Sequence, residues 1–568
     1  MANFNLKVNK DHTYDAIVVG SGISGGWAAK ELCEKGLKTL VLERGRMVRH
    51  VEDYPTMNHE HWDFEHRGKL TAEDEANHHI QIRSGFVNET NKHFYNNDLD
   101  SPYTEVKRFD WIRGNQVGGR SLMWGKQTYR WSDLDFEANA KQGIAVDWPI
   151  RYKDIKDWYT YVEKYVGISG EKLGLDHLPD GHFLPPMEMN CLEKHVKEGI
   201  QKNFKGRHMT VGRVAHLTEP INGRGQCQYR NRCSRGCPFG AYFSSNAVTL
   251  PAADATGNLT LRANSQVASV IYDEKTQKAK GVKVIDSETM EEMEFYAKVI
   301  FLNASTLGTT TILLNSTSSR FPNGMGNDSG ELGHNLMDHH YRVGAMGGYD
   351  GFEDQYYKGR RPNGIFIPRY RNLDEASATK DFIRGYDYQG SAGRGNWGGG
   401  INKEGVGAEF KDGLFEPSGW GMTLVGFGEC LPYHENKVEL NTELKDKWGL
   451  PTLKIDAEFK GNEMAMRKQM KADAVEMLEK AGLKNVTPFD YSGGIGVGVH
   501  EMGTARMGRD PKTSVLNGNN QLHAVPNVFV TDGACMTSSS CVNPSLTYMA
   551  LTARAVDFAV AEINRKNL

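Results

Sequence analysis

Residues 14–32 read YDAIVVGSGISGGWAAKEL, and this stretch decides the fold. The apolar run 16–19 is rich in β-branched residues and predicts a strand that is covered on both faces. Gly20, Gly22 and Gly25 then form GxGxxG, and the helix predicted over 28–35 ends at Gly36. In such a unit the glycines allow a tight turn, contact of a pyrophosphate with the backbone, and close packing of the helix on the sheet. The order therefore predicts a dinucleotide site at the helix N-terminus.

A second strand, predicted over residues 38–42, is followed by Glu43. An acidic residue at this place can hold a ribose hydroxyl, and it disfavours NADP because it would repel the extra phosphate. FAD and NAD both use this unit, so these residues leave the choice between the two cofactors open.

Size and charge narrow the class of protein further. At 568 residues the chain is longer than one hydrophobic core supports, so we expect two large lobes. A net charge of -3 without a dense Lys/Arg stripe excludes a nucleic-acid partner. The N-terminus lacks the apolar core of a signal peptide, and no stretch is apolar enough to predict a membrane span.

Further glycine-rich segments follow along the chain. Residues 113–125 read RGNQVGGRSLMWG, and a loop of this kind suits contact with a diphosphate or a flavin edge. Far downstream lie GVHEMGTARMG at 498–508, VFVTDG at 528–533 and CVNPSLT at 541–547.

Together with NAST at 303–306 and LGHNLMDH at 332–339, these segments resemble the glucose–methanol–choline (GMC) oxidoreductase family in the family's order. The resemblance implies an α/β fold with a discontinuous Rossmann-like FAD-binding domain, residues 1–335 and 490–568, which includes a cysteine-rich loop at 220–245. It also implies an α+β second lobe, residues 336–489, whose antiparallel sheet binds substrate. Runs at 423–427 and 437–440 are expected to be strands, and 463–480 an amphipathic helix.

The resemblance also implies the site residues. The expected FAD-binding positions are Gly20, Gly22, Gly25, Glu43, Arg44, Gly118, Gly119, Ser121, Trp124, Val267, Ala304, Asp532, Gly533, Asn543, Pro544 and Thr547. The expected catalytic pair is His500 and Asn543. Alcohol oxidation needs a group that accepts the hydroxyl proton, and histidine suits this role because its ordinary pKa is about 6.5. Asn543 cannot act as a base, but its amide can orient the substrate oxygen. His339 and His340 either border the pocket or, as we expect, belong to a family motif that packs against the flavin domain.

Three cysteines, Cys227, Cys233 and Cys237, stand close together with the spacing C-x5-C-x3-C. Arg and Lys nearby would favour thiolates. Inert thiols, a disulfide with one spare thiol, and a zinc site completed by His216 are all open on the residues alone. The spacing is similar to that in the catalytic subunits of bacterial FAD-dependent glucose, fructose, gluconate and glucoside 3-dehydrogenases. That similarity implies a [3Fe–4S] cluster held by the three cysteines.

The leading hypothesis is an FAD-dependent dehydrogenase that oxidises a hydroxyl of a sugar or glycoside, with C3 of a glucoside or C1 of an aldose as candidates. The resemblance implies electron transfer through the cluster to a cytochrome c or another acceptor. It also implies a small helper subunit with an export signal, and so a periplasmic location, with a cytoplasmic one as the alternative. Two further hypotheses are an O₂-dependent alcohol oxidase without a cluster and a non-catalytic flavin and iron–sulfur electron-transfer protein.

Overall fold

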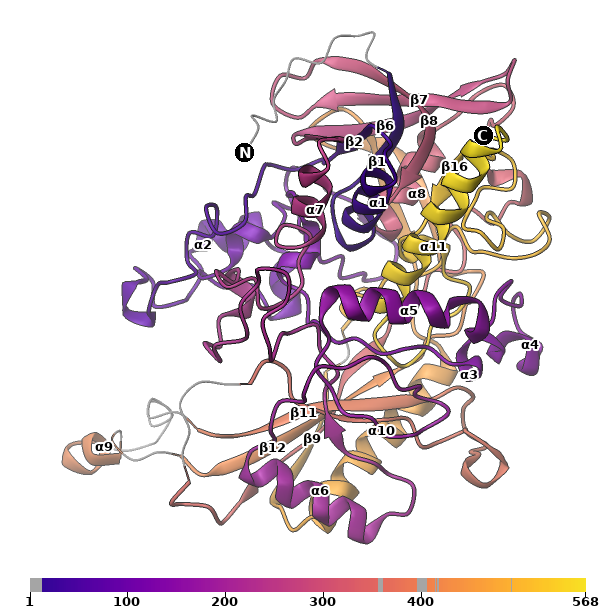
Figure 1. Cartoon of the computed structure of the whole chain (residues 1–568). Helices are drawn as coiled ribbons and strands as arrows, with labels where there is room; N and C mark the ends of the chain where they lie inside the picture. The colour runs from indigo at the N-terminus through magenta and orange to yellow at the C-terminus, as the bar shows by residue number, and fades with distance from the viewer. Residues whose placement is uncertain (1–12, 356–360, 396–405, 414, 416–417, 492) are drawn as a thin grey trace.

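The computed structural model describes residues 13–355, 361–395, 406–413, 415, 418–491 and 493–568. Residues 1–12, part of the segment in which we predict no signal peptide, lie outside this range. Two sheets lie at opposite ends of the molecule (Figure 1). None of the described helices is long and apolar enough to cross a membrane.

The first sheet is assembled from both ends of the chain and from its middle, which confirms the discontinuous Rossmann-like domain. Its parallel part has the order β5-β2-β1-β8, and the C-terminal strand β16 also pairs in parallel with β8. Antiparallel β7 and β6 continue it. The bounds are β1 Thr13–Val19, β2 Thr39–Leu42, β5 Leu259–Arg262, β6 Ser265–Asp273, β7 Lys278–Asp286, β8 Glu292–Leu302 and β16 Val528–Val530.

Helices cover this sheet and bring its distant parts together. α1 (Ile23–Glu34) follows the glycine turn and packs against α7 (Thr249–Ala255) and the C-terminal α11 (Ser545–Asn564). α11 also packs against α5 (Tyr152–Val166), and α8 (Thr306–Asn315) packs against β6. Short helices lie elsewhere, at α2 Ala72–Asn77, α3 Asp133–Phe136, α4 Ala138–Gln142 and α9 Ala408–Gly413.

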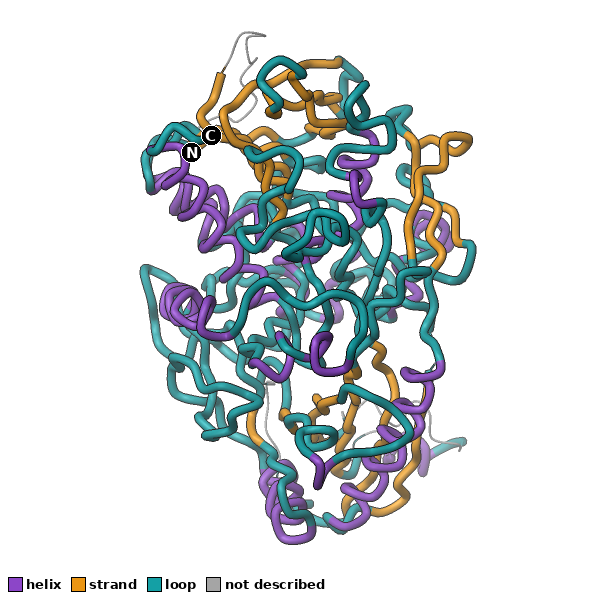
Figure 2. The backbone as a smooth tube through the Cα atoms, turned by 90° about the vertical axis from the view of Figure 1, so that its right-hand side faces the viewer, coloured by secondary structure: helices purple, strands orange, loops and turns teal. Residues whose placement is uncertain are grey.

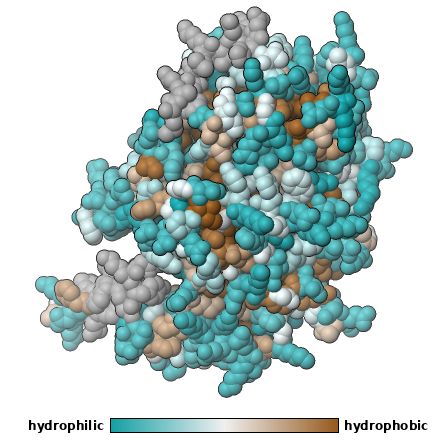
Figure 3. All heavy atoms as spheres, in the orientation of Figure 1, coloured by the Kyte–Doolittle hydropathy of each residue, from teal (hydrophilic) through white to brown (hydrophobic). Residues whose placement is uncertain are grey.

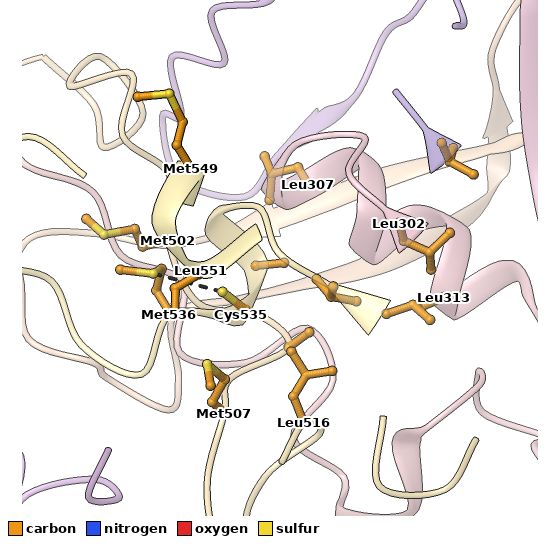
Figure 4. Close-up of a cluster of buried hydrophobic side chains, with 14 of the residues drawn as sticks. Leu302, Leu307, Leu313, Met502, Met507, Leu516, Cys535, Met536, Met549 and Leu551 are labelled. Carbon is orange, nitrogen blue, oxygen red and sulfur yellow. Dashed lines mark hydrogen bonds between the residues drawn. The ribbon is translucent and has the colours of Figure 1, made fainter. Parts of the chain in front are cut away.

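A sulfur-rich core supports the C-terminal loops (Figure 4). Met502, Met507 and Met536 come from loops, and they pack with Met549 of α11 and Leu307 of α8. All five side chains are fully buried. Because protein interiors are close-packed and have low compressibility, this core restrains the loops that carry Met502, Met507 and Met536.

The second sheet is antiparallel, as expected, and it lies at the lower end in Figure 1. Its order is β15-β9-β12-β11-β10-β4. Helix α10 (Gly461–Lys480) packs on β9, β12 and β15, and α6 (Cys191–Asn203) on β11 and β12. The helix expected over 463–480 is therefore confirmed. The bounds are β4 Thr210–Val211, β9 His340–Tyr349, β10 Ile365–Ile367, β11 Tyr386–Arg394, β12 Trp420–Gly428 and β15 Lys484–Asp490.

One expected strand lies in a different place. The run 437–440 is a strand, but it forms β13 (Lys437–Lys445), which pairs with β14 (Pro451–Asp456) and not with the second sheet. β14 pairs in turn with β3 (Thr104–Glu105). The hairpin loop contacts the flavin lobe, where Asp446 accepts a hydrogen bond from Gln266 at 2.9 Å. β4 and α6 also join the second lobe from outside residues 336–489, and the domain boundaries themselves remain a prediction.

Loops fill the middle of the molecule between the strands of the two lobes (Figure 2). The face drawn in Figure 3 is mostly hydrophilic, with apolar side chains in patches near its middle. In open α/β sheets, ligands bind beside the carboxyl ends of the parallel strands. A ligand site is therefore expected at the loops that follow β1, β2 and β8.

Candidate active site

A single cavity of about 700 Å³ connects the glycine turn after β1 to the second sheet. This volume lies within the range of about 300–1,000 Å³ that is usual for small-molecule and cofactor sites. Its wall contains Gly20, Gly22 and Glu43, and it also contains His500 and Asn543. The predicted nucleotide-binding turn and the predicted catalytic pair therefore line the same cavity.

The glycine turn fits a pyrophosphate. Gly20 has φ +91°, and a Cβ there would lie 2.3 Å from the carbonyl oxygen of Asn303. At Gly22 no described atom lies within 4 Å of the position that a Cβ would take. Gly22 is also the N-cap of α1 and has no side chain to cap the first N–H groups. Those N–H groups are free for an anion, and a phosphate can approach the backbone where a side chain would block it.

Glu43 lies in the cavity wall, but its carboxylate already has protein partners. It accepts hydrogen bonds from the backbone N–H of Ser21 at 3.0 Å, from the Ser21 hydroxyl at 2.5 Å and from the Gly45 N–H at 3.1 Å. Glu43 therefore stabilises the glycine turn itself. Any contact with a ribose has to share these two oxygens.

Arg44 also lies in the cavity wall. Its guanidinium donates to the Ser101 hydroxyl at 2.6 Å and lies 4.9 Å from the centre of the Trp448 ring. Asp446 lies 3.5 Å away from it. Ser101, Asp446 and Val267 line the same cavity. The β13–β14 hairpin therefore contributes to the cavity wall beside Arg44.

Most of the predicted cofactor residues meet at this cavity. Those in its wall are Gly20, Gly22, Glu43, Arg44, Gly119, Ser121, Trp124, Val267, Ala304, Asp532, Gly533 and Asn543. The structure brings them together from seven separate segments of the chain. Their role in binding FAD remains a prediction.

Four predicted positions lie behind the wall. A Cβ on Gly25 would lie 1.9 Å from the Gly20 carbonyl oxygen, and one on Gly118 would lie 1.7 Å from Asn246 Oδ1. Both glycines therefore permit close packing within the protein. Pro544 is the N-cap residue of α11, and the Thr547 hydroxyl lies 2.8 Å from the Tyr159 hydroxyl in the core.

The expected catalytic pair is also brought together in the wall of the cavity. Asn543 Nδ2 lies 3.4 Å from His500 Nε2, and Asn543 Oδ1 accepts a 2.8 Å hydrogen bond from Gln389 Nε2. On the opposite side of its ring, His500 Nδ1 lies 3.0 Å from His339 Nδ1. A continuous polar chain thus runs through Gln389, Asn543, His500 and His339.

This chain determines which nitrogen of His500 can act as a base. Only one of the two facing Nδ1 atoms can carry a hydrogen in the neutral pair. We assign that hydrogen to His500, because its Nε2 then keeps a lone pair directed at Asn543 Nδ2 and the cavity. Burial, His339 and Arg120 lower the pKa of His500 well below 6.5. His500 is therefore neutral and able to accept a proton at neutral pH.

Asp338 holds the loop that carries His500. Its carboxylate accepts backbone N–H groups from Gly496 and Gly498 at 2.8 Å each, from His500 at 2.9 Å and from its neighbour His339 at 2.8 Å. The Asp338 side chain is fully buried. The position of His500 therefore depends on one carboxylate in a different segment of the chain.

The cavity wall contains aromatic rings and amide side chains, together with the Arg120–Glu501 ion pair beside His500. The rings of Tyr341 and Phe427 stack 5.1 Å apart at an interplanar angle of 19°. Both line the cavity, together with Phe86, Tyr95, Trp124, Asn88, Gln127, Asn363 and Gln389. Rings that can pack against C–H groups, beside amides that can bind hydroxyls, suit an uncharged hydroxylated ligand.

The three cysteines lie in an exposed loop next to this wall. Three arginines attach the loop to residues 57–60: Arg230 donates to the Met57 carbonyl at 2.7 Å, Arg235 donates to the His59 carbonyl at 3.0 Å, and Arg232 pairs with Glu60 at 2.5 Å. Ser234 of the loop lines the cavity. Cys233 Sγ lies 3.7 Å from His216 Nε2.

These cysteines do not fit a metal cluster as they lie. No group of three His, Cys, Asp or Glu side chains among the described residues is arranged to hold a metal ion. Burial raises the pKa of Cys227 to about 11, and it raises the pKa of Cys233 although Lys126 opposes this. The expectation that neighbouring Arg and Lys keep these two cysteines as thiolates is therefore wrong, because burial has the larger effect. The described cysteines, these three included, form no disulfide.

Sequence reasoning missed three parts of the site. His339 packs against the flavin domain, as expected, but its direct contact with the ring of His500 was not predicted, and neither was the role of Asp338 as the anchor of the loop. Both belong to the LGHNLMDH segment, so the segment was noticed but its role was not. Gln389 lies on strand β11 in a segment without any recognised motif. Only the tertiary structure brings it to Asn543.

Comparison with known proteins gives a consistent result. The sequence profile of the family described as GMC oxidoreductase matches residues 14–341, and the profile of its C-terminal part matches residues 432–552. The 2-methyl-1,2-propanediol dehydrogenase of Mycolicibacterium austroafricanum is 28% identical, over 97% of this chain and 96% of that protein. The fructose dehydrogenase large subunit of Gluconobacter japonicus is 23% identical, over 98% and 99%. The paromamine 6'-oxidase of Streptomyces fradiae is 24% identical, over 97% and 92%.

Solved structures agree on the fold. Formate oxidase of Aspergillus oryzae RIB40 superimposes with a TM-score of 0.62 at 14% identity, covering 98% of this chain and 100% of that one. Pyridoxine 4-oxidase of Mesorbium loti superimposes with a TM-score of 0.59 at 17% identity, covering 96% and 99%.

Proposed function

The chain belongs to the GMC oxidoreductase family, and from that premise we propose that it oxidises a ring hydroxyl of a sugar or glycoside. C3 of a glucoside is the first candidate position, and C1 of an aldose is the second. The family assignment makes the protein an FAD-dependent oxidoreductase that acts on CH–OH groups. The identity of the hydroxyl is the part that we propose.

One observation carries the proposal: His500 Nε2 and Asn543 Nδ2 lie 3.4 Å apart in the wall of the cavity that begins at the glycine turn. Oxidation of an alcohol to a carbonyl removes a hydride from carbon and a proton from oxygen. Bound FAD supplies the hydride acceptor. His500 accepts the proton at Nε2, and Asn543 Nδ2 donates a hydrogen bond to the same substrate oxygen.

A sugar suits the walls near this pair. Tyr341 and Phe427 offer ring faces, and Asn363 and Gln389 offer amides. The names of relatives support oxidation of hydroxyl compounds, since they refer to 2-methyl-1,2-propanediol, to fructose and to paromamine, and fructose is a sugar.

The electron acceptor is a separate question. The cysteine spacing predicts a [3Fe–4S] cluster and an external acceptor, but the described cysteines do not form a metal-binding group, so we derive no electron step through iron. An O₂-dependent oxidase is the second candidate, because named relatives include oxidases. Iron and acid-labile sulfide near three and four per chain would support the dehydrogenase with a cluster. Absence of both, with peroxide formed in air, would support the oxidase.

We also propose that the protein works outside the cytoplasm, exported with a small helper subunit and passing electrons to a cytochrome c or a similar carrier. In support, one relative is named as the large subunit of a fructose dehydrogenase and another as the flavoprotein of a gluconate 2-dehydrogenase. Co-purification of a second subunit from the native host, and fractionation of that host, would test the proposal.

The test of function is an anaerobic titration of the purified holoenzyme with sugars and glycosides, followed by flavin absorbance. Bleaching of the oxidised flavin by at least one sugar is expected, and His500→Ala should slow it by about 10²–10⁴. If no sugar, glycoside or simple alcohol bleaches the flavin, the proposed function is wrong.

A further inference from the structure

The contact between Gln389 and Asn543 joins the two lobes at the reacting end of the cavity. Gln389 belongs to β11, which pairs with β10 on one side and β12 on the other, so its backbone is held in the interior of the second sheet. Its Nε2 donates to Asn543 Oδ1 at 2.8 Å. Both residues line the cavity with His500.

The hydrogen-bonding capacity of the two amides shows what remains for a ligand. One of the two Gln389 Nε2 hydrogens is used by Asn543 Oδ1, and this bond turns Asn543 Nδ2 towards His500. The Gln389 carbonyl oxygen, Oε1, receives no hydrogen bond from any described residue and belongs to a side chain in the cavity wall. The wall therefore offers an acceptor at Gln389 Oε1 next to a donor at Asn543 Nδ2 and an acceptor at His500 Nε2.

A substrate hydroxyl bound by His500 and Asn543 donates to His500 Nε2 and accepts from Asn543 Nδ2. It leaves Gln389 Oε1 without a partner unless a second donor lies close to that oxygen. Because the two amides are bonded directly to each other, the second donor has to be close to the reacting group. A hydroxyl on the adjacent carbon meets this requirement.

We propose that Gln389 recognises the hydroxyl next to the one that is oxidised, so that the enzyme selects vicinal diols over alcohols with a single hydroxyl. This inference rests on the proposed function and narrows it. It makes Gln389 a specificity-determining residue in contact with substrate, and it defines the substrate class as sugars, glycosides and polyols whose reacting carbon has a hydroxylated neighbour.

The expected discrimination follows from the cost of an unpaired acceptor. A site built to bind a hydroxyl rejects an analogue without it, by up to about 10⁴–10⁵ when the site is fully closed. Gln389 is only half-buried, so water can partly replace the missing group. We therefore expect a preference of about 10- to 100-fold in the rate constant for flavin reduction divided by Kd.

The test compares matched pairs of substrates on the holoenzyme. The pairs are 1,2-propanediol with 1-propanol, and methyl α-D-glucopyranoside with its 2-, 3- and 4-deoxy derivatives. Flavin reduction is followed anaerobically by stopped flow. If the propanols are substrates, we expect 1,2-propanediol to react about 10- to 100-fold faster than 1-propanol. If the glucosides are substrates, we expect the parent glucoside to react faster by the same factor than at least one deoxy derivative that keeps the reacting hydroxyl.

Two substitutions separate recognition from positioning. Gln389→Leu removes both the acceptor and the donor, and it should reduce the preference to less than about threefold. Gln389→Glu keeps an acceptor but, when ionised, cannot donate to Asn543 Oδ1. It should slow all substrates while retaining most of the preference. Gln355→Leu makes the same change at an exposed glutamine of the same lobe and should leave both rates unchanged.

Three outcomes would contradict the proposals. Members of every pair reacting within threefold in the unchanged enzyme would overturn the role of Gln389. So would a Gln389→Leu protein that loses the same factor on both members of a pair, because that loss indicates only positioning of Asn543. If none of these compounds and no other sugar bleaches the flavin, the proposed function itself fails.

Discussion

Two loops border the same cavity, and they differ in how tightly the rest of the molecule holds their reactive side chains. In the loop 496–500, Asp338 binds three backbone N–H groups and His339 binds the ring of His500. In the loop 227–237, arginines attach the backbone to residues 57–60. The thiols there have few partners: Cys233 faces His216 at 3.7 Å, and Cys227 receives the Tyr229 N–H at 3.4 Å.

This difference shows that a spacing of reactive residues predicts chemistry only when other segments orient those residues. His500 and Asn543 are 43 positions apart, yet their side chains meet because two separate segments are fixed on one core. The three cysteines are close in sequence, and their side chains do not form a ligand group among the described residues. Whether reactive side chains form a site thus depends less on their proximity in sequence than on the tertiary contacts that orient them.

The largest effect is expected from substitution of His500 in the loop 496–500. His500→Ala removes the proton acceptor, so the rate of flavin reduction by substrate should fall by about 10²–10⁴ while the FAD content stays the same. Stopped-flow absorbance measures the rate. His66→Ala, at an exposed histidine, is the matched control and should change nothing. Equal rates in the two variants would mean that the loop does not supply the base.

The second prediction concerns the anchor of that loop. Asp338→Asn keeps the shape of the side chain, but an NH2 group replaces one of the two carboxylate oxygens, and it cannot accept the two backbone N–H bonds that this oxygen receives. A buried unsatisfied donor costs about 1–3 kcal/mol, so we expect a lower thermal midpoint and a rate of flavin reduction lower by about 10- to 100-fold. Asp328→Asn breaks an exposed ion pair with Arg320 and serves as the control. A variant with normal rate and midpoint would show that the loop orders itself without the carboxylate.

The third prediction separates His339 from simple packing. His339→Leu removes the acceptor for His500 Nδ1–H and should lower the rate about tenfold, which corresponds to about 1.4 kcal/mol. His339→Asn places an amide oxygen near the lost Nδ1 and should restore most of it. A His339→Leu protein with the rate of the unchanged enzyme, beside a slower His339→Asn protein, would indicate that His339 only packs against His500.

The pH dependence of the unchanged enzyme gives an additional check on the same pair. Burial lowers the pKa of His339 to about 4 and that of His500 well below 6.5. A base must be unprotonated, so activity is fully present above these pKa values and is lost as the pH falls through that of His500. The acid limb should therefore lie well below pH 6.5. A midpoint at or above pH 6.5 would contradict the assigned environment.

The smallest effect is expected in the cysteine loop. Cys233→Ser should leave the rate of flavin reduction by substrate within about twofold, because this thiol is not on the path that the proton takes. The same stopped-flow assay measures it, with Cys191→Ser as a control far from the cavity. A tenfold loss would show that the loop shapes the substrate end of the cavity through Ser234.

Short-range patterns predicted much of the fold. The strand, glycine turn and helix at residues 14–34 form as expected because their signals are local: β-branched residues in the strand, Gly20 at φ +91° and Gly22 as the N-cap. The helix α10 was found by its apolar periodicity. The strand at 437–445 was also predicted, but its sheet was not, since pairing partners are not encoded in the run itself.

The sequence by itself determined the family, the flavin-binding lobe and the identity of the two residues expected to react, because each depends on a motif whose members are neighbours along the chain. Only the tertiary structure decided that Asp338, His339 and Gln389 lie around that pair, and that the three half-buried cysteines of the loop 227–237 are not arranged as a metal-binding group among the described residues. The physical reason is that hydrogen-bond partners and burial are set by segments more than a hundred residues apart. Those partners and that burial determine which protons the site can hold.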